Sequence, residues 1–108
     1  MPEEIYGKYI DNLKPIYGKR LDKVILFGSY ARGDHSPSSD VDIMILLDIP
    51  REEISAFDEA LCDMTFDFNM EHDVDFSPVT QNSRFFQKWE NILPFYSNVK
   101  KEGILLYG

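Results

Sequence analysis

The chain has 108 residues, a formal net charge of −8 and a hydrophobic fraction of 44%. This length suits one domain with a modest core, which we place at residues 1–108. No apolar run approaches the roughly 20 residues that span a bilayer. The first residues do not follow a signal-peptide pattern, and the lone Cys62 cannot form an internal disulfide. These features favour a cytoplasmic protein. The acidic balance argues against a long nucleic acid as the main partner, because phosphate contacts need Lys or Arg.

Apolar periodicity and turn residues divide the chain into alternating helices and strands. In chain order, we expect a helix over 3–18, a strand over 21–27, a short helix over 29–32, a loop over 33–39, a strand over 41–47, a helix over 51–68, a strand over 73–79, a helical region over 81–101, and a strand or extended tail over 104–107. Pro15 kinks the first helix or ends it near Lys14, and Pro94 interrupts the last. The order predicts a small α/β (α+β) domain. It leaves open whether the sheet is parallel, mixed or antiparallel.

Asp40 and Asp42 stand at the head of the second predicted strand. Side chains two residues apart on a strand share a face, with Cα atoms about 6.5 Å apart. Two carboxylates at that spacing can bind one metal ion or bridge two. The alternative is a pair of solvated aspartates at a strand entrance.

Gly28 and Ser29 end the first predicted strand and begin a short helix. Glycine allows a phosphate to approach the backbone closely, and the serine hydroxyl can donate a hydrogen bond to a phosphate oxygen. Arg32 lies one turn further and could add a charge-assisted contact. The alternative is an ordinary strand-to-helix turn with Ser29 as the N-cap.

A third acidic position falls in the segment Asp73-Val74-Asp75-Phe76. On a strand, Asp73 and Asp75 would share one face, and either could complete a group of three carboxylates. The alternative is a charged sheet edge that discourages aggregation. The residues alone do not choose between the two aspartates.

The run from Leu26 to Gly33, followed at fixed spacing by Asp40-Val41-Asp42-Ile43, resembles the signature of the nucleotidyltransferase superfamily that includes DNA polymerase beta. The small size and the ending Lys101–Tyr107 are similar to the minimal nucleotidyltransferase family. The resemblance implies a mixed sheet with helices mainly on one face. It implies that Gly28 and Ser29 hold the triphosphate of ATP, and it selects Asp75 as the third acid.

The same resemblance implies a chemistry. Asp40, Asp42 and Asp75 would be the catalytic carboxylates and would bind Mg²⁺, with two ions expected. An acceptor hydroxyl would attack the α-phosphate of ATP and receive AMP. Minimal members similar to this chain are paired as MntA-type antitoxins with a HEPN-domain ribonuclease toxin, and they transfer AMP to a tyrosine of that toxin.

Two other functions stay open at this point. The chain could inhibit its partner by binding alone, with no transfer. It could instead modify a small molecule such as an aminoglycoside, which would need a homo-oligomer to build the acceptor pocket. The sequence does not fix the acceptor, the number of AMP groups transferred, the base preference or the oligomeric state.

Overall fold

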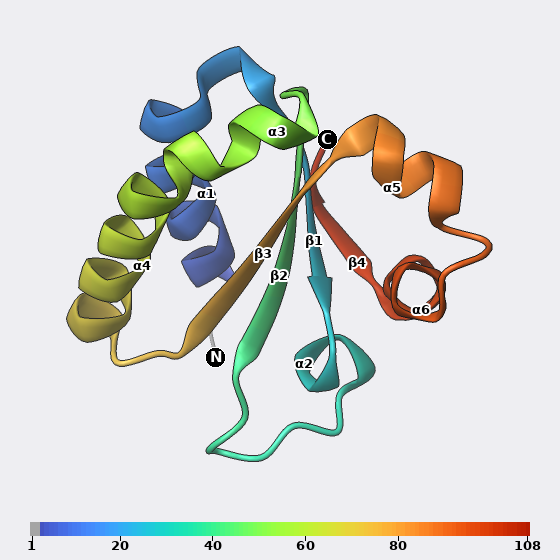
Figure 1. The fold of residues 1–108 in the computed structure, drawn as a ribbon. Coiled ribbons are helices and arrows are strands. Elements are labelled where there is room, and N and C mark those ends of the chain that lie inside the picture. Colours follow the sequence, from blue (N-terminus) through green and yellow to red (C-terminus); the bar gives the residue numbers. More distant parts are fainter. Residues whose placement is uncertain (1–2) are drawn as a thin grey trace.

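A four-stranded sheet forms the centre of the computed structural model, which describes residues 3–108. The strands are β1 (Leu21–Phe27), β2 (Val41–Leu47), β3 (Phe76–Asn82) and β4 (Ile104–Tyr107). Their order across the sheet is β3-β2-β1-β4 (Figure 1). β1 runs antiparallel to both β2 and β4, whereas β2 and β3 are parallel. The sheet is therefore mixed, as the family resemblance implies.

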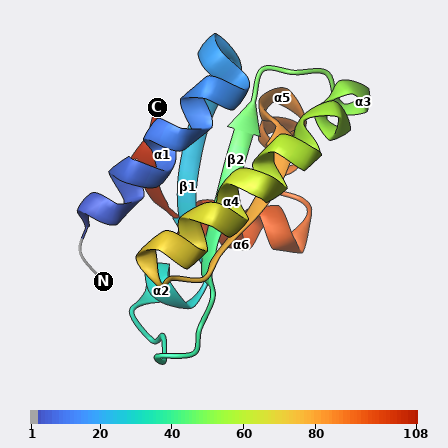
Figure 2. The ribbon, with the colours of Figure 1, turned by 90° about the vertical axis from the view of Figure 1, so that its left-hand side faces the viewer.

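Helices cover both faces of the sheet unequally. The α-helices are α1 (Glu4–Tyr17), α2 (Ser29–Arg32), α3 (Arg51–Ile54), α4 (Asp58–His72), α5 (Ser83–Trp89) and α6 (Pro94–Glu102), with 3₁₀ turns at Gly18–Arg20 and Ser55–Phe57. The two longest, α1 and α4, lie together on one face, and the shorter α5 and α6 lie on the other (Figure 2). The larger helical layer thus sits on one side.

The sequence of β2 explains this layering. Val41, Ile43 and Ile45 point into the main core beneath α1 and α4, while Met44 and Leu46 point into a smaller core with α5 and α6. Successive side chains on a strand alternate between faces, so a continuous apolar run is what a strand covered on both faces requires. Asp42 lies two residues before Met44 on the same strand, so its side chain lies on the face that α5 and α6 cover.

Pro15 and Pro94 have different effects on their helices. Of the two alternatives for Pro15, an end of the first helix near Lys14 is wrong, because the helix runs through Pro15 to Tyr17. Pro15 has no N–H to donate to the Asp11 carbonyl, but both residues lie on the exposed side of the helix, where water can replace the lost hydrogen bond. The predicted interruption of the 81–101 helical region at Pro94 is confirmed, since α5 ends at Trp89 and α6 begins at Pro94.

The third strand begins at Phe76 rather than Asp73. The helix before it continues past Phe68 to His72, and Asp73 closes this helix in the left-handed conformation with φ 52°. Aspartate adopts this conformation more readily than most residues. Asp73 therefore belongs to a helix end and shares no strand face with Asp75.

None of the helices within residues 3–108 is both long and apolar enough to cross a membrane.

Candidate active site

Three strand ends meet at one end of the sheet. The pairs Phe27↔Asp42 and Val41↔Phe76 bring together the carboxyl end of β1 and the amino ends of β2 and β3. The Val41 N–H donates to the Asp75 carbonyl at 2.8 Å, which extends the β2–β3 ladder by one residue. The predicted residues on all three strands therefore gather at this end, where α2 also lies (Figure 1).

Gly28 and Asp42 are in direct contact across this end. Gly28 has φ 74° and ψ −155°, a conformation that is essentially confined to glycine. A Cβ atom built on it would overlap Oδ2 of Asp42. The glycine is needed both for its backbone angle and for the space that the carboxylate occupies.

The surroundings of the Asp42 carboxyl group favour its protonated form and so raise its pKa. Partial burial raises its pKa, the nearby Asp40 carboxylate raises it further, and Arg32 lowers it. Two like charges held close together disfavour ionisation of one another. A cation bound between Asp40 and Asp42 would relieve both effects.

Asp75 continues the β3 ladder toward the same end. Phe76 is buried in the main core with Val41, so strand alternation directs Asp75 to the opposite face, the face of Asp42. Asp73 lies beyond the turn at the end of α4. The backbone geometry therefore favours Asp75 over Asp73 as the third carboxylate.

The carboxylates share a sheet end but do not converge. Within residues 3–108, no three His, Cys, Asp or Glu side chains lie close enough together to hold a metal ion. Carboxylates repel one another without a cation between them. Their oxygen donors are nevertheless of the kind that Mg²⁺ prefers, and the mutual charge of Asp40 and Asp42 fits a divalent cation.

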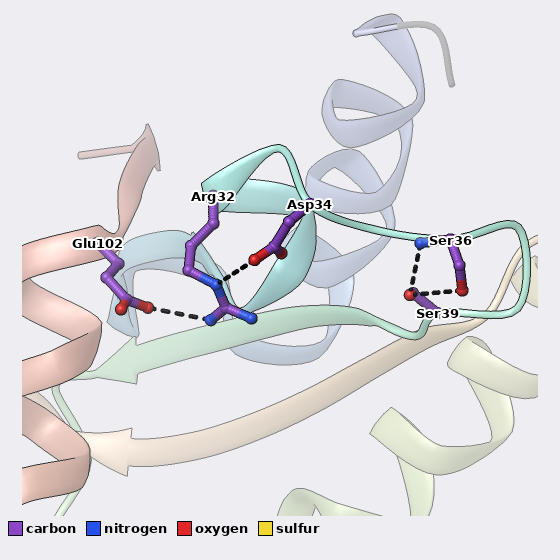
Figure 3. Close-up of polar contacts among 5 residues, drawn as sticks. All are labelled: Arg32, Asp34, Ser36, Ser39 and Glu102. Atoms are coloured by element: carbon purple, nitrogen blue, oxygen red, sulfur yellow. Dashed lines mark hydrogen bonds and ion pairs between the residues drawn. The ribbon is translucent and has the colours of Figure 1, made fainter.

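Arg32 is held by two carboxylates rather than directed at the sheet end (Figure 3). Its Nε donates to Asp34 Oδ2 at 3.1 Å, and its Nη1 donates to Glu102 Oε2 at 3.2 Å. These hydrogen bonds raise the pKa of Arg32. An incoming phosphate must therefore compete with Asp34 and Glu102 for this guanidinium.

Ser29 is the first residue of α2, with Gly28 as its N-cap. Its backbone carbonyl accepts hydrogen bonds from the amides of Gly33 and Asp34 at 2.9 and 3.1 Å. Its hydroxyl makes none of the side-chain hydrogen bonds found within residues 3–108. The side chain is therefore able to meet a ligand without breaking an existing contact.

The connection between α2 and β2 is closed by its own residues. The Ser36 N–H donates to Ser39 Oγ at 2.9 Å (Figure 3), and the His35 ring stacks on Tyr30 with ring centres 3.9 Å apart. These contacts hold the loop beside α2.

A hollow of about 240 Å³ lies between the end of β1, α2 and α6. Its lining residues are Phe27, Gly28, Arg32, Phe95, Asn98, Val99 and Glu102. The contribution of α6 was missed in the sequence, because Glu102 is 70 residues from Arg32 and no local pattern marks it. Only its acidic charge near an otherwise basic helix end could have drawn notice.

Comparison with known proteins places the chain. Residues 7–106 match the family model of the nucleotidyltransferase domain. The chain belongs to this nucleotidyltransferase family. Two relatives from Methanocaldococcus jannaschii are named "Putative protein adenylyltransferase". MJ0604 is 34% identical over 97% of both chains, and MJ0141 is 33% identical over 82% of this chain and 91% of its own.

Solved structures share the fold of this nucleotidyltransferase. A toxin–antitoxin structure with AMP-PNP superposes on this chain with a TM-score of 0.61 at 22% sequence identity. The match covers 95% of this chain and 73% of the chain in that structure. A tri-AMPylated Shewanella oneidensis HEPN toxin in complex with MNT antitoxin gives a TM-score of 0.59 at 21% identity, covering 100% and 73%. The predicted fold class and family are confirmed.

Proposed function

We propose that this nucleotidyltransferase transfers AMP from ATP to a hydroxyl group of a partner HEPN-domain ribonuclease toxin, a tyrosine by family resemblance, and thereby acts as its antitoxin. The observation that carries the proposal is the contact of Asp42 with Gly28. This contact brings a carboxylate next to a backbone position that a phosphate can approach closely, at the sheet end where Asp40 and Asp75 also lie.

The carboxylates, the glycine, the serine and the arginine at this end would serve the reaction in different ways. Asp40, Asp42 and Asp75 would hold Mg²⁺, which when bound neutralises the charge on the reacting phosphate and the departing pyrophosphate. Gly28 leaves room for the triphosphate, and the free Ser29 hydroxyl donates to one of its oxygens. Arg32 would exchange a carboxylate partner for a phosphate.

The transfer itself is a displacement at the α-phosphorus of ATP. The acceptor oxygen forms the new P–O bond, the bond to pyrophosphate breaks, and the acceptor hydroxyl loses its proton. Asp75 would either hold the second metal ion or accept that proton as a general base. Positioning of the two reactants supplies much of the rate in reactions of this kind.

The partner and the cellular location are supported indirectly. The curated relatives carry the name of protein adenylyltransferases, and the toxin–antitoxin structures share the fold. Because these relatives are named for adenylyl transfer to protein, the acceptor hydroxyl would come from a protein. We place the protein in the cytoplasm with this partner.

The test is incubation with ATP, Mg²⁺ and a purified HEPN-domain ribonuclease, followed by intact-mass measurement of the ribonuclease. We expect a mass gain of one or more AMP groups. Asp40→Asn, Asp42→Asn and Asp75→Asn should each lower transfer by about 100-fold or more, whereas Asp73→Asn, the matched control, should retain it. Transfer that survives Asp42→Asn would refute the assignment of the site.

The assay also separates the alternative functions. Inhibition of the ribonuclease without any mass gain would show that binding alone silences it. Transfer to an aminoglycoside but not to the ribonuclease would show a small-molecule enzyme.

A further inference from the structure

The helix α4 carries an apolar stripe on its exposed side. Cys62, Phe66 and Met70 recur every fourth residue, so they lie along one side of the helix. Phe66 is 65% exposed and Met70 is 71% exposed. The residues that α4 buries against the main core are different ones, Leu61, Thr65 and Phe68. The helix therefore has a second apolar side that residues 3–108 leave exposed. We name Cys62, Phe66 and Met70 the α4 stripe.

A hollow of about 520 Å³ separates the α4 stripe from strand β3. Cys62 and Phe66 line it from the helix, and Pro78 and Thr80 line it from the strand. Large apolar side chains that gather around a hollow, rather than standing singly, mark an interaction surface.

The backbone of β3 is partly open on this side, because β3 is an edge strand. The bond from Val41 to the Asp75 carbonyl fixes which residues face β2, so the peptide groups of Phe76 and Thr80 point outward. Asn69 satisfies both groups of Phe76, at 2.9 and 3.1 Å. Within residues 3–108, no hydrogen bond is found to the outward N–H and carbonyl of Thr80, so a short extended segment could pair there.

The charges around the stripe define what can bind it. The helix α4 contains no Lys or Arg, and its carboxylates are Asp58, Glu59, Asp63, Asp67 and Glu71. A second copy of this chain would bring like charges together at the same surface, and a nucleic acid would be repelled. An apolar segment of another protein, flanked by Lys or Arg, could pack its apolar side chains on the α4 stripe and pair its basic side chains with these carboxylates.

The stripe also leads toward the candidate active site. From Met70 the chain passes through the helix end at Asp73 and reaches Asp75 within a few residues. We propose that the α4 stripe, with the Thr80 edge of β3, docks an apolar, basic-flanked segment of the protein that receives AMP. The inference takes only the identity of that protein from the proposed function.

Cys62, the only cysteine, is exposed within the hollow and provides a direct probe. We expect a purified HEPN-domain ribonuclease to slow alkylation of Cys62 by N-ethylmaleimide about 10-fold or more. The double variant Phe66→Ser/Met70→Ser should weaken binding of the ribonuclease by about 10- to 100-fold, the range typical of anchor residues. Ile92→Ser is the matched control, since Ile92 is equally exposed at 65% but lies between α5 and α6.

Two further measurements separate this inference from the proposed function. ATP binding by Phe66→Ser/Met70→Ser should equal that of the wild type, because the stripe is on the other face of the sheet from Asp42. Asp63→Lys/Asp67→Lys should weaken binding of the ribonuclease as well. Loss of binding in these variants without any AMP transfer by the wild type would support the docking surface and refute only the proposed function.

Three results would overturn the docking surface. They are an unchanged affinity in Phe66→Ser/Met70→Ser, unchanged Cys62 alkylation in the complex, and self-association of the wild type that the double variant abolishes.

Discussion

Replacing Gly28 by alanine tests the contact at the centre of the candidate active site. Gly28 has φ 74° and ψ −155°, and a residue with a Cβ atom pays about 1–3 kcal/mol to adopt such a conformation. The new Cβ also overlaps the Asp42 carboxylate, which must move. We therefore expect Gly28→Ala to lower the free energy of unfolding by about 2–4 kcal/mol, a large part of the roughly 5–15 kcal/mol of a small domain.

Gly33→Ala is the matched control. Gly33 also has a positive φ of 82°, but a Cβ atom there meets nothing within 4 Å, so it should cost only about 1–2 kcal/mol. Equilibrium urea unfolding, followed by circular dichroism, measures both. In an Asp42→Ala background the cost of Gly28→Ala should fall by about 1 kcal/mol, because the overlap is gone. Equal costs for the two glycines, with no coupling to Asp42, would refute this account.

Three further predictions concern Glu102, Asp42 and Asn69. Glu102→Gln should release Arg32 for phosphate, so ATP should bind more tightly by isothermal titration calorimetry; weaker binding would instead assign Glu102 a supporting role. Burial and the neighbouring Asp40 raise the pKa of Asp42 above its ordinary value of 3.8, so the folded protein binds the Asp42 proton more tightly than the unfolded chain does. This proton binding stabilises the fold at low pH, and the stabilisation is lost as the pH rises from 3.8 through the raised pKa. Asp42→Asn should therefore unfold at a higher urea concentration than the wild type at neutral pH, even though transfer is lost; an equal or lower midpoint contradicts this sign. Asn69→Ala leaves both outward groups of Phe76 without partners and should cost about 2 kcal/mol in the same urea assay, whereas a neutral result would mean that water replaces the amide.

The local sequence was enough to predict the strands that carry the motifs. Each of the first two strands contains a continuous apolar run, Val24–Phe27 and Ile43–Leu47, next to turn residues, so strands over 21–27 and 41–47 and a short helix over 29–32 are confirmed. Their side-chain directions follow from alternation alone. The family resemblance supplied what periodicity could not, the mixed direction of the strands.

The remaining parts depend on contacts between distant segments. The beginning of β3 is set by Asn69, which bonds the backbone of Phe76, and by Asp73, which ends α4. Neither contact is visible as a periodic pattern, and the alternation of Asp73 with Asp75 suggested a strand that starts too early. The pairing of Arg32 with Glu102 likewise joins two segments, 70 residues apart, that only the folded sheet brings together.

The register of β1 against β2 carries a consequence for how such proteins are found. Gly28 and Asp42 meet because Phe27 pairs with Asp42, whereas the residues between them, 33–38, are exposed and form a loop. Long surface loops tolerate insertion at a modest entropic cost. The count of residues between the glycine and the aspartates is thus a property of one loop rather than of the chemistry. A chain with a longer excursion there could assemble the same contact and still escape a search that fixes the spacing.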